Sequence, residues 1–218
     1  ADVDAFLRHA GIMGLKGCLA PNELAALTET QSRAVRIAAC IALRKLEAPE
    51  IVTFLDDPDP RIVIEAIRAI NDLAIEEAYP AVQSYSSRLV HSQLPQNQIP
   101  DEMVFRRLVN VNFRSTGTAG AKTLMLMASN PALPVNYRAV ALQALAVWPE
   151  PPPIDPSVGI YRPLEKRDVA SGLNTIREDL VDLLASAKES VIIGQALRVA
   201  NAFDHPVPPK LLRAWLMN

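Results

Sequence analysis

Three carboxylates lie close together at Asp56, Asp57 and Asp59, and such a group could bind a divalent cation. The same residues directly precede a stretch with helical periodicity, which begins at Arg61. Aspartate is favoured just before a helix, where its charge complements the helix dipole. We therefore interpret the three side chains as helix caps and predict no metal site.

The histidines and cysteines form no ligand set either. His9, His91 and His205 are far apart, and none has a second His or a Cys at the spacing of a metal site. Cys18 and Cys40 make neither a metal motif nor the dense pattern of a disulfide scaffold. Cys40 lies in an apolar stretch, so we expect a small buried thiol there. We predict that the chain binds no cofactor.

Catalytic motifs are missing as well. Gly117-Thr118-Ala119-Gly120 precedes a predicted helix and faintly resembles a phosphate-binding turn, but no strand precedes it and no Lys-Ser/Thr follows. The sequence contains no nucleophile elbow and no Cys-x-x-Cys-His haem motif. It therefore assigns no catalytic, cofactor-binding or metal-binding residue, and it leaves the partner-binding residues unknown. We expect that the chain is not an enzyme.

Composition favours an all-α fold. Half of the 218 residues are hydrophobic but only 5% are aromatic, and 18 prolines accompany 8 glycines. Aliphatic side chains suit helices packed on helices, and proline is common where short helices begin. The net charge is −2 and the pI about 6.0, whereas nucleic-acid-binding domains are normally basic. We expect no nucleic-acid partner, and no membrane insertion because the sequence lacks a run of about 18 apolar residues.

An internal repeat organises the chain. Each copy has a large residue, usually followed by Arg, then small central residues and a closing Leu or Ile. Four stretches fit this description, residues 7–15, 35–43, 62–70 and 137–145, and a weaker copy covers 105–113. The closing residues Leu15, Leu43 and Ile70 are 28 and 27 positions apart (43 − 15 and 70 − 43). Apolar positions at i, i+3, i+4 and i+7 predict one buried helix face in each copy. Leu15, Leu43, Ile70 and Leu145 are the expected core anchors.

A second, shorter helix is expected after most copies. These predicted helices cover residues 22–28, 49–55, 75–85 and 118–128. Residues suited to begin a helix precede the first helices: Ser32 before Arg33, Asp59 before Pro60, and Asn130-Pro131 before the copy at Tyr137. Because one helix pair cannot bury its own apolar face, the copies must stack on one another.

The pattern resembles the HEAT-repeat family. The resemblance is strongest in residues 35–55 and 57–81, where the run DPDPRIVIEAIRAI at 57–70 is close to the family consensus. The family's typical Arg is matched by Arg8, Arg36 and Arg138. Val63 stands at that position in the third copy and interrupts any ladder of arginines. The resemblance implies a right-handed α-solenoid, an α-α superhelix of short helical repeats. It implies nothing about activity.

Two stretches break the rhythm of the repeats. Residues 86–100 are polar and indicate an insertion or an extended connection between helices. Residues 148–163, which we call the strap, contain six prolines and must be extended or polyproline II. We expect Trp148, Ile154, Val158, Ile160 and Tyr161 to be buried and to hold the strap across the helices, joining two parts of one stack; an exposed hinge is the alternative.

The predicted organisation is a single domain spanning residues 1–218. Its repeats cover about 2–28, 31–56, 57–85, 100–128 and 130–148, followed by the strap and by C-terminal helices within 164–218. These last helices are expected at 164–187, 190–203 and 208–217.

The functional prediction is a non-catalytic protein-interaction or scaffold module. Alternatives are a nucleic-acid enzyme of the HEAT-like DNA glycosylase type, which the acidic pI disfavours, and a protein similar to the phycobilin lyases. The chain also resembles part of a group of large bacterial proteins, the multi-domain membrane-bound or sorbosone-type dehydrogenases, which carry a c-type cytochrome domain. The resemblance lies in the order of three segments: the HEAT pair, residues 106–114, and the strap ending Tyr161-Arg162-Pro163. That resemblance implies a periplasmic or exported setting, with neighbouring domains of the same chain, or another protein, as partners. The start at Ala1 without a signal peptide is interpreted as an excised or processed chain.

We predict that the chain does not bind duplex DNA tightly at physiological salt. The near-neutral charge offers few phosphate contacts, and those contacts supply most non-specific affinity. Fluorescence anisotropy with a labelled duplex should therefore show no binding at low micromolar protein. Tight binding that weakens steeply with added salt would support the glycosylase-type alternative.

Overall fold

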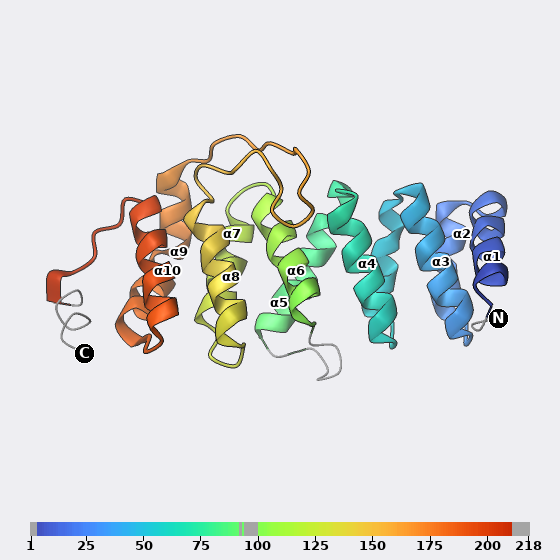
Figure 1. The fold of residues 1–218 in the computed structure, drawn as a ribbon, viewed down its shortest axis with the longest axis horizontal. Coiled ribbons are helices and arrows are strands. Elements are labelled where there is room, and N and C mark those ends of the chain that lie inside the picture. The colour runs from blue at the N-terminus through green and yellow to red at the C-terminus, as the bar shows by residue number, and fades with distance from the viewer. Residues whose placement is uncertain (1–3, 92, 94–99, 211–218) are drawn as a thin grey trace. The chain divides into compact units, whose positions relative to one another are not determined.

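The protein is all-helical in the part that the structure describes, a computed structural model covering residues 4–91, 93 and 100–210 (Figure 1). Within those ranges no strand occurs, and the isolated antiparallel bridge between Ile154 and Tyr161 lies in the strap. The all-α prediction is therefore confirmed. Among the described residues no helix is both long and apolar enough to cross a bilayer.

The chain divides into two compact units, residues 1–108 and 109–218. The boundary falls inside helix α6 (Glu102–Arg114). Each unit is described separately, and the prediction of a single domain stays a prediction.

Unit 1 is built from long first helices and shorter second elements. Its elements are α1 (Ala5–Cys18), α2 (Pro21–Ala26), η1 (Leu27–Glu29), α3 (Arg33–Leu46), η2 (Pro49–Asp56), α4 (Pro60–Asp72), η3 (Glu76–Ala78) and α5 (Tyr79–Val90). Helix α3 packs on both α1 and α4, while η2 contacts α2, α4 and α5 (Figure 1). The first helices thus pack in chain order, and the second elements pack beside them.

Local sequence explains where the first helices of unit 1 begin. The Ser32 hydroxyl accepts a hydrogen bond from the backbone N–H of Val35, and the Asp59 carboxylate accepts one from Arg61. Both residues were predicted caps. Pro60 occupies the first turn of α4, where its missing N–H has no helical partner to lose.

The second elements differ in part from the prediction. Residues 49–56 form the 3-10 helix η2 rather than an α-helix. The predicted helix at 75–85 is split into η3 and α5, and α5 continues to Val90. The predicted connection at 86–100 is therefore wrong for residues 86–90, because Ser86 and Leu89 are buried on the inner face of α5. Most of its remainder lies outside the described residues.

The predicted anchors of unit 1 are confirmed for two of three residues. Leu43 and Ile70 are completely buried. Leu15 is only half-buried, and the buried residue of α1 is Ile12. The prediction for Leu15 is wrong: among the described residues α1 has its main packing against α3, whereas α3 is covered by both α1 and α4.

Unit 2 repeats the arrangement with four complete helices. They are α7 (Ala119–Ser129), α8 (Val135–Ala146), α9 (Val169–Ser186) and α10 (Ser190–Ala202). Helix α8 packs on α7 and α10, and α9 contacts the same two helices. Leu145, the fourth predicted anchor, is completely buried.

Three boundaries in unit 2 depart from the prediction. Asn130 does not cap α8; its side chain accepts a hydrogen bond from the backbone N–H of Ala132 in the preceding turn. Helix α9 begins at Val169 rather than at 164, since Asp168 caps it by accepting from Ser171. The predicted helix at 208–217 lies largely outside the described residues.

We predict that Leu43→Ala lowers the free energy of unfolding by about 2–5 kcal/mol, the range for a fully buried leucine. Leu15→Ala is the matched control and should cost about 1 kcal/mol, because its side chain already contacts solvent. Urea melts of the two variants check this. Equal losses would contradict the packing order of α1, α3 and α4.

Candidate interaction site

The three clustered aspartates have three different roles. Asp59 caps α4 as predicted and also pairs with Arg33. Exposed Asp56 forms an ion pair with Arg88, whose N–O distance is 2.7 Å. Asp57 is buried and accepts from Arg36 at 2.8 and 3.3 Å. The cap prediction is therefore wrong for Asp56 and Asp57.

Arg36 joins two successive first helices. It lies on α3, and its Nη1 donates to the backbone oxygen of Thr30 at 3.0 Å, in the turn that precedes that helix. Its other nitrogens bind Asp57, two residues before the cap of α4. Asp57 also accepts from the backbone N–H of Asp59 at 2.8 Å. The guanidinium thus fixes the turn before its own helix and the turn before the next one.

Arg138 makes the corresponding contacts in unit 2. Its Nε donates to the backbone oxygen of Ala128 at 2.9 Å, near the end of α7. Its Nη1 donates to the Glu189 carboxylate at 2.9 Å, at the residue that precedes α10. Backbone hydrogen bonding at Glu189 and the Arg138 charge hold the pKa of that carboxyl below its ordinary value.

The other repeat positions do not join this pattern. Arg8 on α1 is exposed, and Val63 on α4 is buried without a charge to pair. We call the contacts of Arg36 and Arg138 the arginine bridges. The sequence identified the two arginines through the family resemblance, but it did not identify Asp57 or Glu189 as their partners.

The histidines and cysteines do not converge. His9 and His91 are exposed, and Nδ1 of His91 lies 2.7 Å from the backbone oxygen of Ser87. Cys18 is exposed, whereas Cys40 is buried as predicted. Burial raises the pKa of the Cys40 thiol, and the Glu65 and Asp57 charges add to the effect. No group of three or more His, Cys, Asp or Glu side chains that could hold a metal occurs among the described residues.

The glycines of the 117–120 turn have structural roles. Gly117 has a φ of 69°, in the left-handed region that glycine adopts without strain. A Cβ at Gly120 would lie 1.9 Å from the backbone oxygen of Asn112, so glycine lets α7 approach the backbone of α6 closely. These constraints explain the glycine pair without a phosphate.

A hollow of about 240 Å³ lies beside this turn in unit 2. Its lining residues are Gly117, Thr118, Trp148, Arg167, Asp168 and Ser171. The Asp168 carboxylate already caps α9 through the backbone N–H of Ser171. The Asp168 side chain of this lining thus has a structural role at the start of α9.

The strap is fixed from inside by a buried carboxylate. Asp155 is 1% exposed, and its Oδ2 accepts from the side-chain nitrogen of Asn110 at 3.1 Å. Arg114 and Arg162 each place a nitrogen 3.6 Å from the same oxygen. Oδ1 accepts from the backbone N–H of Ser157 at 2.8 Å. One side chain thus ties the strap to the second half of α6.

Backbone hydrogen bonds shape the strap around Asp155. Its N–H donates to Ile160 and its carbonyl accepts from Gly159, both at 2.8 Å. Gly159 has a φ of 70°, which suits glycine at this reversal. The two nitrogens Nη1 and Nη2 of Arg114 donate to the backbone oxygen of Arg162 at 3.1 and 3.2 Å. The strap is therefore a closed turn rather than an extended linker.

The start of the strap is held by an aromatic and cationic stack. Trp148 is buried and stacks on Phe203 at 5.8 Å, and the guanidinium of Arg167 lies 4.9 Å from the rings of Trp148 and Phe113. Arg167 donates to the backbone oxygens of Trp148 and Phe113 at 3.1 and 2.5 Å. Burial, and secondarily the Arg114 charge, lower the pKa of Arg167 to about 10, so the guanidinium stays protonated at neutral pH. A Cβ at Gly172 would meet both rings of the Trp148–Phe203 stack, so glycine is needed there.

Three of the five apolar residues predicted to be buried in the strap are exposed, and Val158 is half-buried. Ile154, Ile160 and Tyr161 are 48, 49 and 69% exposed. Ile154 and Tyr161 pair across the antiparallel bridge, so their side chains lie on the same side. Trp148 is buried as predicted, but the rest of the strap is held by charge and backbone hydrogen bonds. The strap thereby presents an outer apolar face on an anchored backbone.

Comparison with protein-family models, curated proteins and solved structures found no match to this chain. The HEAT-repeat resemblance stays a prediction. The site is accordingly interpreted from its own geometry.

We predict that Asp155→Ala opens the strap. It leaves the Arg114 and Arg162 guanidiniums without their buried carboxylate, and removing one partner of a buried ion pair typically costs about 3–5 kcal/mol. Limited chymotrypsin digestion at Tyr161 should then be faster than in the unaltered chain. Glu150→Ala removes the exposed pair with Lys166 in the same segment and should leave the cutting rate unchanged. Equal rates in both variants would show that Asp155 does not anchor the strap.

Proposed function

We propose that this chain is a non-catalytic protein-interaction module, an α-solenoid of HEAT-like repeats whose strap carries the binding surface. The observation that carries this proposal is the exposure of Ile154, Ile160 and Tyr161 on a strap that buried Asp155 anchors, with Ile154 and Tyr161 on one side of the bridge.

The arginine bridges support the solenoid. Arg36 and Arg138 belong to corresponding copies of the repeat, and each binds a carbonyl before its own helix and a carboxylate before the next first helix. A contact that recurs between successive copies is what a stack of equivalent repeats requires. The packing of α3 on α4 and of α8 on α10 follows the same order.

The anchored strap supports an interaction role. Binding is weakened by the entropy of ordering loops and side chains, so a surface that is ordered beforehand loses less free energy when a partner binds. Asp155, Arg114 and Arg167 order the strap without using its aliphatic and aromatic side chains. Those side chains stay available for an apolar surface of another protein or of a neighbouring domain in the same parent chain.

We propose, on the family resemblance, that the parent protein is an exported bacterial redox protein. The strap ending Tyr161-Arg162-Pro163 and the HEAT pair support this context. The full-length gene product tests it: a flanking propeller and a Cys-x-x-Cys-His segment are expected, and their absence would exclude this parent.

We predict that a photo-reactive residue at Tyr161 captures one defined partner or neighbouring domain when the full-length protein is expressed in its native cells. A photo-reactive residue at Val191 is the matched control, since Val191 is 54% exposed on α10 of the same unit. Mass spectrometry of the cross-linked products should identify a recurring peptide for position 161 and none for position 191. Identical products at both positions, or none at either, would contradict the strap as the binding surface.

A further inference from the structure

Charge is divided unevenly between the two kinds of helical element in unit 1. The first helices α1, α3 and α4 contain eight Arg or Lys and two Asp or Glu, a net charge of +6 (8 − 2). The second elements α2, η1, η2, η3 and α5 contain one Arg and six Asp or Glu, a net charge of −5 (1 − 6). Interspersed signs keep a protein surface free of large fields of one sign. This division instead gives unit 1 a basic layer and an acidic layer.

The exposed cations of the basic layer gather on α3 and α4, which pack on each other. Five side chains there reach solvent, and we call them the basic face: Arg33, Arg44, Lys45, Arg61 and Arg68. Lys45, Arg61 and Arg68 form no ion pair with any described residue. Their charge is therefore not neutralised within the part of the chain that the structure describes.

The two ion pairs within this layer leave positive charge at the surface. Arg33 pairs with Asp59, and the side chains are 47 and 16% exposed. Arg44 pairs with Glu65, and the side chains are 38 and 15% exposed. In each pair the carboxylate is largely covered and the guanidinium is the group that meets solvent. The pairs therefore extend the basic face rather than interrupt it.

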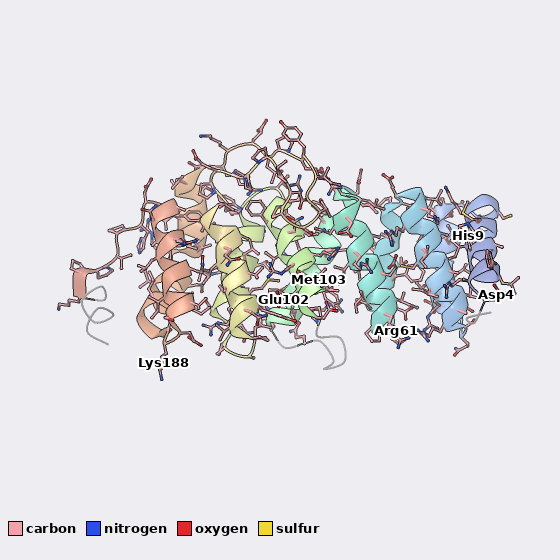
Figure 2. All side chains as sticks on the ribbon, in the orientation of Figure 1. Asp4, His9, Arg61, Glu102, Met103 and Lys188 are labelled. Atoms are coloured by element: carbon pink, nitrogen blue, oxygen red, sulfur yellow. The ribbon has the colours of Figure 1, made fainter. Side chains whose placement is uncertain are left out.

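The register of α3 against α4 brings the unpaired cations near one another. The 2.6 Å contact between Nη1 of Arg44 and Oε1 of Glu65 places the end of α3 beside the middle of α4. Lys45 follows Arg44 directly, and Arg68 is three residues beyond Glu65. Arg61, labelled in Figure 2, is at the start of α4. It precedes Arg68 by two helical turns, so both lie on the same side of α4, about 10 Å apart along the axis.

The basic face is bounded by carboxylates. Exposed Glu47 directly follows α3, and Asp72 at the end of α4 accepts from Nε of Arg107 at 2.9 Å. Helices of this length are about 20 Å long, and packed helix axes are about 8–10 Å apart. The face is therefore short and only two helices wide.

A short acidic segment fits such a face better than a long polyanion does. Complementary charge steers association and selects the partner. A nucleic-acid duplex would bring only a few of its phosphates to so short a face. A protein segment with clustered Asp or Glu can bring all of its carboxylates there.

We propose that the basic face of α3 and α4 binds an acidic segment of another protein, whose carboxylates pair with Lys45, Arg61 and Arg68. This inference concerns unit 1, goes beyond the proposed strap interaction and does not depend on it. Because these cations are exposed, their ion pairs are individually weak and are screened by salt. We expect a dissociation constant on the order of 10–100 μM at about 50 mM salt, rising at least about fivefold at about 300 mM.

Fluorescence anisotropy with a labelled hexaglutamate peptide tests the proposal. Arg61→Glu/Arg68→Glu reverses two charges without touching the ion pairs of Arg33 and Arg44, and it should weaken binding by at least about tenfold. Arg61→Lys/Arg68→Lys keeps the charge and should bind like the unaltered chain.

The matched control is Arg177→Glu/Arg198→Glu, which changes the net charge by the same amount at exposed residues of unit 2. It should leave the dissociation constant unchanged within about twofold, because those residues are outside the basic face. Circular dichroism of the two charge-reversed variants should be the same, which separates loss of the surface from loss of the fold.

Four results would overturn the proposal. The peptide could fail to bind at 50 mM salt, or both charge reversals could weaken binding equally, which would show an effect of net charge alone. Tighter binding of a labelled DNA duplex, lost in Arg61→Glu/Arg68→Glu, would identify a nucleic-acid surface instead. Dimers in sedimentation equilibrium that the same variant abolishes would identify the acidic layer of a second copy as the occupant.

Discussion

The buried guanidinium is the interaction on which the order of the helices depends. Moving a charge out of water is costly, and the cost is offset only when hydrogen bonds and an opposite charge are supplied together. Arg36 obtains them from Thr30 and Asp57, and Arg138 from Ala128 and Glu189. Each arginine therefore requires the segment before its own helix and the start of the next first helix to be in one particular register. Apolar packing alone would tolerate some sliding of one helix along another. The hydrogen bonds of a buried guanidinium would be broken by such sliding.

A buried charge of the opposite sign fixes the strap, because it too must be paired and hydrogen-bonded. Asp155 is a buried carboxylate that needs donors, and Asn110, Arg114 and Arg162 supply them. Prolines prevent the strap from forming a helix or a ladder of its own, so its backbone depends on these side-chain contacts. In both places a buried charge specifies a loop that hydrophobic burial could not specify.

The helices could be predicted from the sequence because their periodicity is local. Leu43, Ile70 and Leu145 close apolar stripes and are fully buried. Leu15 closes a similar stripe but is only half-buried. Burial depends on whether another helix covers the face, and the residues of the stripe itself do not specify that helix. The sequence therefore predicted which residues form the core inside the helix stack, but not that Leu15 on α1 would be only half-buried.

The charged partners could not be predicted, for a related reason. Asp57 looks like a cap because it lies beside a helix start, and its partner Arg36 is 21 residues away. Asp155 lies among prolines and apolar residues, and its donor Asn110 is 45 residues away. The exposed Ile154 and Tyr161 were misassigned for the same reason: hydrophobicity was taken as the force that orders the strap.

The exposed apolar residues of the strap are explained by the buried charges that fix its backbone. Where a buried ion pair fixes the backbone, as at Asp155, aliphatic and aromatic side chains are not needed for stability and can remain exposed. Helix α1 also exposes apolar side chains, Phe6, Leu7 and Met13, although Ile12 of the same helix is buried. Exposed apolar surface carries an aggregation risk, and an anchored backbone limits that risk because its own hydrogen-bonding groups are already paired. The strap is ordered by its own contacts, and a surface that is ordered beforehand loses less conformational entropy when anything binds to it.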